Sequence, residues 1–185
     1  SSDGTSWESR SQYLTQYGLR GVTYGNGIFV AVGDYGTRAT SPDGTSWEII
    51  QGSVTQNTLR GVAYGNGTFV AVGDSGTTLT SADGAVWSLN QNYLMMGYTG
   101  ERNLKGGTFR NNTFAAVVES ANSEYGSVFI SPDGNTWNEQ DSSSTISKLF
   151  GITYAKSTFV TVGYQGTILT SSNAVLTTDE STQLA

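Results

Sequence analysis

Cysteine and histidine are both absent from the 185 residues of this sequence. Without cysteine the chain has no disulfide and no thiol nucleophile, and without histidine it has neither Ser-His-Asp nor Cys-His catalysis. The same absences exclude zinc fingers and nearly all transition-metal sites, whose usual ligands are thiolate and imidazole. Carboxylate and carbonyl oxygens remain, and these would suit only calcium or magnesium. We expect neither a cofactor nor a metal ion.

Charged residues are also scarce, at 13% of the chain, and the formal net charge is −6. This balance argues against a nucleic-acid or anionic-membrane partner held by charge. No segment approaches the roughly 18 apolar residues that a membrane helix needs, so we expect no membrane insertion. The chain has 24 glycines and only two prolines, and it is polar and poor in lysine. We expect such a turn-rich chain to be extracellular or at the cell surface.

One seven-residue phrase occurs four times. It begins at residues 1, 41, 81 and 131 as SSDGTSW, SPDGTSW, SADGAVW and SPDGNTW, and a decayed copy, SSNAVLT, begins at residue 171. The copies are therefore spaced by 40 or 50 residues. Periods of this length indicate one supersecondary unit per copy, stacked or arranged in a ring.

Each repeat is predicted to form four short strands. In the first full copy, LRGVTY is followed by the tight turn GNG, because Asn-Gly tolerates the positive φ of a hairpin turn. IFVAVG is a continuous apolar run, typical of a strand buried on both faces. TRATS and a last strand beginning at Trp47 complete the unit. Four antiparallel strands in about 40 residues predict a β-propeller blade.

The repeated phrase is interpreted as a turn lock. Asp43 can accept hydrogen bonds from backbone N–H groups of its own turn, and Ser41 can bond across it. Gly44 supplies a backbone geometry that other residues resist, and Trp47 covers the hairpin. Catalytic or calcium-binding roles for the aspartates are disfavoured, because each lacks a close partner carboxylate. The residues assigned this structural role are Asp3, Trp7, Asp43, Trp47, Asp83, Trp87, Asp133 and Trp137.

The phrase resembles the Asp-box (BNR-like) of bacterial sialidase-type β-propellers, Ser/Thr-x-Asp-x-Gly-x-x-Trp, with one residue fewer between Asp and Gly. The fuller pattern also resembles non-enzymatic secreted bacterial repeat proteins and, more distantly, photosystem II assembly factors. The resemblance covers residues 1–173 and implies a propeller in which the box is structural and lies away from the active face. The matching residues are Ser1, Asp3, Gly4, Trp7; Ser41, Asp43, Gly44, Trp47; Ser81, Asp83, Gly84, Trp87; and Ser131, Asp133, Gly134, Trp137.

The expected architecture is an all-β propeller of four-stranded antiparallel blades in a single domain, 1–173, with a C-terminal tail at 174–185. The blades lie near 19–54, 59–98, 104–145 and 149–173, the last completed by residues 1–12. Residues 5–12 would then supply the outer strand of the last blade and close the ring without an open edge. The sequence leaves two alternatives open. In one the chain is part of a longer ring, and in the other the tail forms that strand and leaves 1–12 to pair with another molecule.

Two insertions lengthen the third repeat. They are expected on one face, opposite the Asp-boxes, and extra loop length of this kind favours a partner-binding role. The first, at 90–102, contains Tyr93, Leu94, Met95, Met96 and Tyr98 and is either a contact site or a plug over the channel. The second, at 119–125, is acidic and polar and is predicted to be a loop.

A second candidate site comes from equivalent positions in the repeats. Arg20, Arg60 and Lys105 share one position, which Phe150 takes in the fourth copy. Together they could bind an acidic ligand near the channel mouth. The alternative, which the sequence favours, is ion pairing with the turn residues Asp34, Asp74 and Glu124, whose fourth copy is Tyr164. Tyr35 and Tyr125, at the turn tips, are further candidates for stacking against a sugar.

The function expected is a non-catalytic extracellular module that binds a glycan or a protein through the face carrying both insertions. One alternative is a self-assembling extracellular subunit, a filament or surface layer, joined through strand edges or the Tyr/Met loop, which makes a homo-oligomer possible. A second is a fragment of a glycoside hydrolase, with Glu119 and Glu124 as the carboxylates nearest the expected site. The sialidase arginine motif is absent near the N-terminus, so we expect no enzymatic activity.

Overall fold

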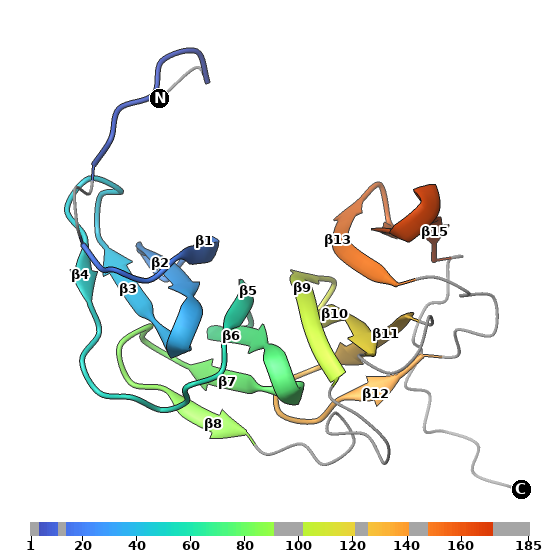
Figure 1. Cartoon of the computed structure of the whole chain (residues 1–185). Helices are drawn as coiled ribbons and strands as arrows, with labels where there is room; N and C mark the ends of the chain where they lie inside the picture. The colour runs from blue at the N-terminus through green and yellow to red at the C-terminus, as the bar shows by residue number, and fades with distance from the viewer. Residues whose placement is uncertain (1–3, 11–13, 91–101, 121–125, 141–147, 172–185) are drawn as a thin grey trace, which may run out of the picture.

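The computed structural model describes residues 4–10, 14–90, 102–120, 126–140 and 148–171, and these residues form β-strands, turns and three one-turn 3-10 helices (Figure 1). Among them no helix is long and apolar enough to cross a membrane. The first two sheets contain β1 (Leu19–Gly25), β2 (Ile28–Gly33), β3 (Arg38–Ser41), β4 (Glu48–Ile49), β5 (Leu59–Gly65), β6 (Thr68–Gly73), β7 (Thr78–Ser81) and β8 (Ser88–Asn90). The last two contain β9 (Arg102–Arg110), β10 (Thr113–Ser120), β11 (Gly126–Ser131), β12 (Asn138–Glu139), β13 (Leu149–Ala155), β14 (Thr158–Gly163) and β15 (Ile168–Thr170).

Each repeat forms one antiparallel sheet whose strands pair in chain order. β1 and β2 meet at a two-residue turn in which Asn26 and Gly27 have φ values of 49° and 80°. Positive φ at both positions is the geometry for which Asn-Gly is favoured in hairpins. The first three sheets have four strands, and the fourth has three among the described residues. The all-β prediction and the four-strand pattern of the repeat are thereby confirmed.

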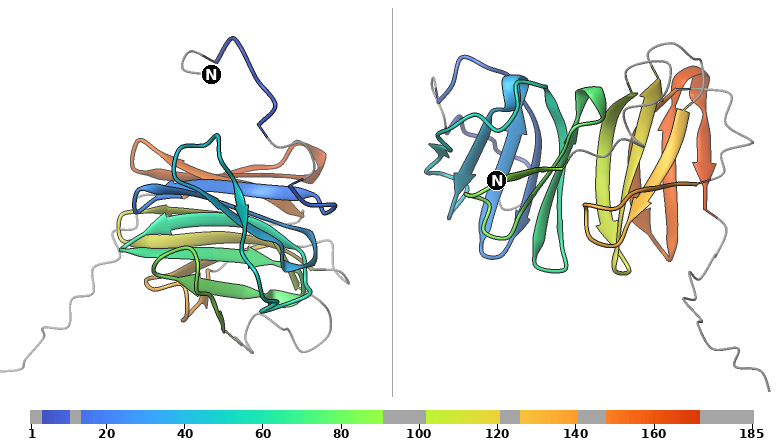
Figure 2. Two further views of the ribbon diagram at one scale, coloured as in Figure 1. Left: turned by 90° about the vertical axis from the view of Figure 1, so that its left-hand side faces the viewer. Right: turned by 90° about the horizontal axis from the view of Figure 1, so that it is seen from below.

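The four sheets lie face to face along an arc, with β1 beside β5, β5 beside β9, and β9 beside β13 (Figures 1 and 2). The first strand of each repeat is therefore the innermost. Small residues allow these inner strands to approach closely. A Cβ atom added to Gly21 would lie 3.2 Å from the Gly61 Cα, and one added to Gly61 would lie 3.0 Å from the Gly107 amide nitrogen.

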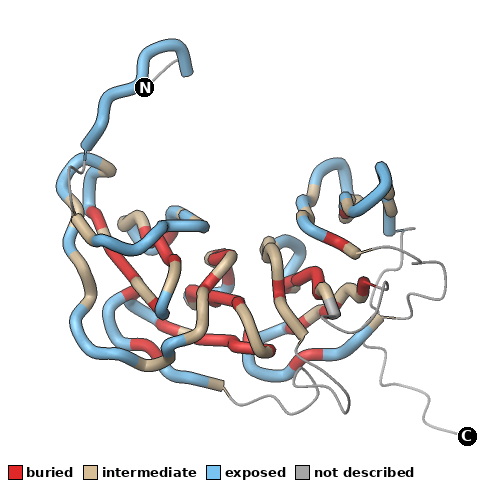
Figure 3. The backbone as a smooth tube through the Cα atoms, viewed as in Figure 1, coloured by how far each residue is buried: buried red, intermediate tan, exposed pale blue. Residues whose placement is uncertain are grey.

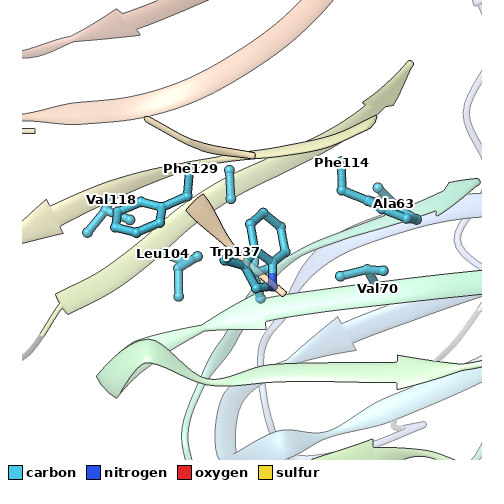
Figure 4. Close-up of a cluster of buried hydrophobic side chains, with 9 residues drawn as sticks. Ala63, Val70, Leu104, Phe114, Val118, Phe129 and Trp137 are labelled. Atoms are coloured by element: carbon cyan, nitrogen blue, oxygen red, sulfur yellow. The ribbon is translucent and has the colours of Figure 1, made fainter. Parts of the chain in front are cut away.

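The core lies between successive sheets rather than in one central mass (Figure 3). One buried cluster joins the first two sheets through Val30, Val32, Leu59 and Phe69. A second cluster joins the second and third sheets, and Trp137 is its largest member (Figure 4). The apolar run in β6 sends side chains to both faces, Phe69 and Ala71 into the first cluster and Val70 and Val72 into the second. A strand that supports two interfaces in this way reads as continuously hydrophobic.

The structure corrects the sequence prediction at the second insertion. Glu119 and Ser120, expected in a loop at 119–125, belong to β10, where they pair with Asn103 and Arg102 of β9. The insertion therefore begins by lengthening a hairpin, because β9 and β10 extend together beyond the ends of the equivalent strands. Residues 121–125 lie outside the described part of the chain.

The described part of the N-terminal segment forms no strand of a shared blade in this structure. Residues 5–10 form no strand, and the segment points away from the arc, whose first and fourth sheets stand apart on its open side (Figure 1). Trp7 on this segment is 83% exposed. The segment starts at the first sheet and does not reach the fourth within this chain. Ring closure and blade number remain predictions.

Candidate functional site

The sheets have two chemically different ends. At one end lie the 3-10 turns η1 (Asp34–Gly36), η2 (Asp74–Gly76) and η3 (Tyr164–Gly166), and we name this end the turn face. The inner strands begin there, since the Asp34 N–H donates to the Gly18 carbonyl just before β1. The opposite end carries the Asn-Gly hairpins and the repeated Ser-x-Asp-Gly turns, and we name it the box face.

On the box face each turn is held by hydrogen bonds within itself. The N–H groups of Thr45 and Ser46 both donate to Asp43 Oδ1, at 2.7 Å. The Gly44 N–H donates to Ser41 Oγ at 2.8 Å, and Gly44 has a φ of 75°. The donated bonds, above all that from Ser46, hold the pKa of Asp43 well below its usual range. The Asp43 carboxylate therefore serves to stabilise its own turn.

The same arrangement recurs in the second and third box turns. The pKa of Asp83 is lowered by N–H bonds from Val86 and Ala85. At Asp133, desolvation raises the pKa but is outweighed by the N–H bonds from Thr136 and Asn135, so the pKa is again lowered. Asp3 lies outside the described residues, which contain no group of three acidic side chains able to hold a metal ion.

The box tryptophans fix the turns to the sheets. Trp47, Trp87 and Trp137 each donate their indole N–H to the carbonyl of the box glycine three residues earlier. Trp87 and Trp137 are buried between sheets, whereas Trp47 is only half-buried. The end of the arc explains the difference for Trp47, because no sheet precedes the first one among the residues that the structure describes.

On the turn face, two of the predicted cations form paired contacts. Arg20 Nη2 donates to Asp34 Oδ2 at 3.0 Å, and its Nε donates to the other carboxylate oxygen. Arg60 and Asp74 repeat this two-point pairing one sheet later, with Nη2 to Oδ2 at 2.8 Å. The Arg20 guanidinium holds the pKa of Asp34 below its usual range. For these two repeats the structure shows the ion-pairing alternative.

The third repeat uses a different carboxylate from the one predicted. Lys105 Nζ lies 2.6 Å from Glu119, and Lys148 Nζ, at the start of the fourth repeat, lies 3.1 Å from the same carboxylate. Burial raises the pKa of Glu119, but the two ammonium groups outweigh it and the pKa is lowered. Glu124, the expected partner, lies outside the described residues.

Exposed aromatic side chains surround these ion pairs. The rings of Tyr17 and Tyr35 are in contact at a tilt of 42°, with centroids 4.9 Å apart, and both side chains are exposed. Tyr35 stands at the tip of η1 with a φ of 54°. In the fourth repeat Phe150 and Tyr164, which replace the cation and the anion, are exposed as well. The turn face therefore combines paired charges with uncovered aromatic surface.

Both insertions leave the described structure at the turn face. Asn90 ends β8 opposite Thr78, next to η2, and β9 and β10 pair up to Arg102 and Ser120. The candidate binding residues of the two insertions fall in 91–101 and 121–125, outside the described part of the chain. These are Tyr93, Leu94, Met95, Met96, Tyr98 and Tyr125.

Two hollows lie on the box face instead. One, of about 400 Å³, lies between the second and third sheets and is lined by Asn66, Val86, Asp133 and other residues. Another, of about 500 Å³, is formed by the hairpin tips around Arg110 and Lys156. Asp133 is already bonded within its turn. Neither hollow gathers the candidate residues, so the turn face remains the best candidate site.

Sequence reasoning missed Glu119 as the third anion and Lys148 as its second partner. The signal was present in the spacing. Asp34 follows Phe29 by five residues, and Glu119 follows Phe114 by five. The spacing to the following glycine predicts Glu124 instead, because Glu124 precedes Gly126 by two residues, as Asp34 precedes Gly36. Counting from the strand gives the right residue, because paired strands hold their register while an insertion does not.

Comparison with protein-family profiles and with curated protein sequences found no match. Among solved structures, the chain is similar to YCF48 from Cyanidioschyzon merolae, with a TM-score of 0.65 and 17% identity over 90% of this chain and 56% of that one. A structure of YCF48 bound to D1 peptide matches with a TM-score of 0.65 and 16% identity, over 86% of this chain and 51% of that one.

Two further structures are similar at lower identity. The computationally designed Ika4 protein matches with a TM-score of 0.60 and 14% identity, over 90% of this chain and 98% of that one. A putative glycosidase from Bacteroides thetaiotaomicron matches with a TM-score of 0.51 and 10% identity, over 82% of this chain and 65% of that one. The chain spans about half the length of YCF48. These likenesses show the fold alone: the chain is an all-β protein built of β-propeller-like antiparallel sheets.

Proposed function

We propose that the chain is a non-catalytic binding module that holds a protein partner on its turn face. The observation that carries the proposal is the exposed Tyr17–Tyr35 pair beside the Arg20–Asp34 ion pair. Tyrosine and arginine are the side chains most enriched where proteins contact one another, because they combine a large apolar surface with hydrogen-bonding groups. We further propose that the module acts outside the cell or at its surface.

A protein partner fits this surface better than a glycan does. The cations that a glycan carboxylate or sulfate would need are engaged by Asp34, Asp74 and Glu119. What remains uncovered is aromatic, and it includes Phe150, which offers a sugar hydroxyl no hydrogen bond. YCF48 was solved with a bound peptide, which supports peptide binding as a use of this fold, and the two insertions leave from the same face.

The absence of catalysis is part of the proposal. A glycosidase acid must be protonated near neutral pH, which requires a raised pKa. The pKa of Glu119 is lowered by Lys105 and Lys148 in spite of burial, which is the opposite direction. Glu119 is therefore proposed to hold the third and fourth repeats together as a carboxylate anion.

The test uses a display library of linear peptides and a glycan array, both applied to the purified chain. The variant Y17N/Y35S gives the first repeat the residues that the second carries as Asn57 and Ser75, the latter at a φ of 53°. The fold should therefore tolerate it. V86A, on the exposed box face, is the control. Selected peptides should bind the double variant at least about tenfold more weakly and V86A normally. Equal binding to all three, or variant-sensitive binding confined to the glycan array, would overturn the proposal.

A further inference from the structure

The outward surface of the first sheet presents residues that are buried at every internal interface. Leu19 is 42% exposed, whereas its equivalent in the second repeat, Leu59, is fully buried against the first sheet. Val22 is 62% exposed, whereas Val62 is 7% exposed. The side chains are identical and lie on equivalent strands. Their exposed fractions differ because the second sheet packs on the first, whereas no described sheet covers this surface of the first sheet. We name the surface of Leu19, Val22 and Tyr24 the first end surface.

The fourth sheet ends in the opposite half of such an interface. Val162 is 48% exposed, although Val32 and Val72 at the same position are buried against the following sheet. Ile168 on the neighbouring strand is exposed too. We name the surface of Val162 and Ile168 the second end surface. Each end surface therefore resembles one side of a contact that the chain makes between its own sheets.

Backbone spacing supports the same pairing. Gly21 and Gly61 let the first two inner strands approach closely, and a Cβ on Gly106 would come within 3.7 Å of the Gly151 Cα in the next sheet. Among the atoms of the described residues, an added Cβ at Gly151 would approach only Cγ2 of Val162 within 4 Å, in its own sheet. Its side of the strand is open for another inner strand, and Gly21 is the residue with the matching position.

Trp7 points to the same conclusion. It belongs to a box turn that precedes the first sheet, so by the repeat pattern its strand is the outer strand of the sheet before. Trp87 meets Phe69 with ring centroids 6.5 Å apart, and the equivalent partner for Trp7 is Phe159 in the fourth sheet. Among the described residues, β15 forms the outer edge of that sheet with no strand paired to its far side.

We propose that a second copy of this chain packs its first end surface on the second end surface of the first copy. Its N-terminal segment, residues 4–10, then supplies the outer strand beside β15, with Trp7 against Phe159. The partner is a second copy rather than the same chain, because the two end surfaces stand apart across the open side of the arc and residues 4–10 point away from it (Figure 1). A contact of this kind joins unlike surfaces, and in the proposed assembly it is made twice, so that two chains close one ring.

Crosslinking tests the proposal, since the chain has no cysteine of its own. Single variants V22C and V162C, carrying tags of different size, are mixed and treated with a short bismaleimide. We expect a crosslinked species with one chain of each kind, and light scattering of the wild-type chain at a mass of twice 19.6 kDa. V86C paired with V162C is the control and should not crosslink, because Val86 is even more exposed than Val22, at 74% against 62%, but lies on the box face.

Two results would overturn the proposal. One is a monomeric mass at about 100 µM, well above the dissociation constants of specific assemblies. The other is a V22C/V162C double variant that crosslinks within single chains at a rate independent of concentration, because this would show closure within one chain. As a second readout, V22K should raise the dissociation constant of the dimer at least about 100-fold, while V86K leaves it unchanged and both variants stay folded by circular dichroism. Peptide binding at the turn face does not enter this test.

Discussion

The box face and the turn face stand at opposite ends of the same strands, and they differ in how strictly the repeats agree. On the box face, the three described complete turns repeat the same bonds: aspartate and serine oxygens accept backbone N–H groups, and the tryptophan donates its indole N–H. On the turn face the equivalent tips are Tyr35, Ser75 and Gln165, and the third repeat carries an insertion. Residues that stabilise each sheet are the same in every repeat. Residues that differ between repeats are not required for the fold, so they can contribute to binding.

The largest expected effect is on the box face. Trp137→Ala should lower the free energy of unfolding by roughly 3–5 kcal/mol, because this indole is buried between two sheets and its loss leaves a cavity. Trp87→Ala should behave similarly. Trp7→Ala is the matched control and should leave the stability of the single chain within about 0.5 kcal/mol. Urea unfolding of dilute samples measures the difference, and equal losses at Trp7 and Trp137 would contradict the packing described here.

Next in size is the effect of a methyl group at the end of an inner strand. Gly65→Ala would place a Cβ 2.0 Å from the ring of Phe109, so the neighbouring sheet must move, at a cost of about 1–3 kcal/mol. Gly106→Ala is the control, since its Cβ would find ordinary contacts from 3.6 Å outward. Thermal unfolding should separate the two variants clearly. A melting temperature lowered equally by both would argue against the close approach.

The box turns should also give stability a pH dependence. The pKa of Asp133 is lower in the folded chain than in the unfolded one, so its contribution is present above the unfolded pKa of about 3.9 and is lost as pH falls through the folded pKa. Asp133→Ala should cost about 1–2 kcal/mol at pH 7. The difference in unfolding free energy between wild type and variant, measured by urea unfolding at several pH values, should become smaller below about pH 4. A difference in unfolding free energy that widens on acidification would contradict a lowered pKa of Asp133 in the folded chain.

The smallest expected effect on stability lies at the turn face. Arg60→Ala should cost at most about 1 kcal/mol, because the Arg60–Asp74 pair is partly exposed and solvent screens it. The cost should shrink further in 1 M salt, where charges are screened over about 3 Å. Chemical unfolding at low and high salt checks both statements. A loss as large as that of Trp137→Ala would mean that the turn face is as structural as the box face.

The sequence predicts the sheets well and the site less well, for a physical reason. Asn-Gly turns and the apolar runs around Phe29 and Phe69 are local signals, and the strands follow them. Glu119 was misplaced because its role depends on the register between β9 and β10, which the insertion obscures. The angle between successive sheets could not be predicted either, because it is set by contacts between strands far apart in the sequence, such as those at Gly21 and Gly61, rather than by local patterns.

The most direct test of the division between the two faces is the dissociation constant of one selected peptide, measured by calorimetry. The wild-type chain is compared with Y17N/Y35S and with V86A at matched thermal stability. The account predicts that binding weakens at least about tenfold in the turn-face variant and stays unchanged in the box-face variant. Unchanged binding in Y17N/Y35S together with weaker binding in V86A would place the function on the box face and contradict the account.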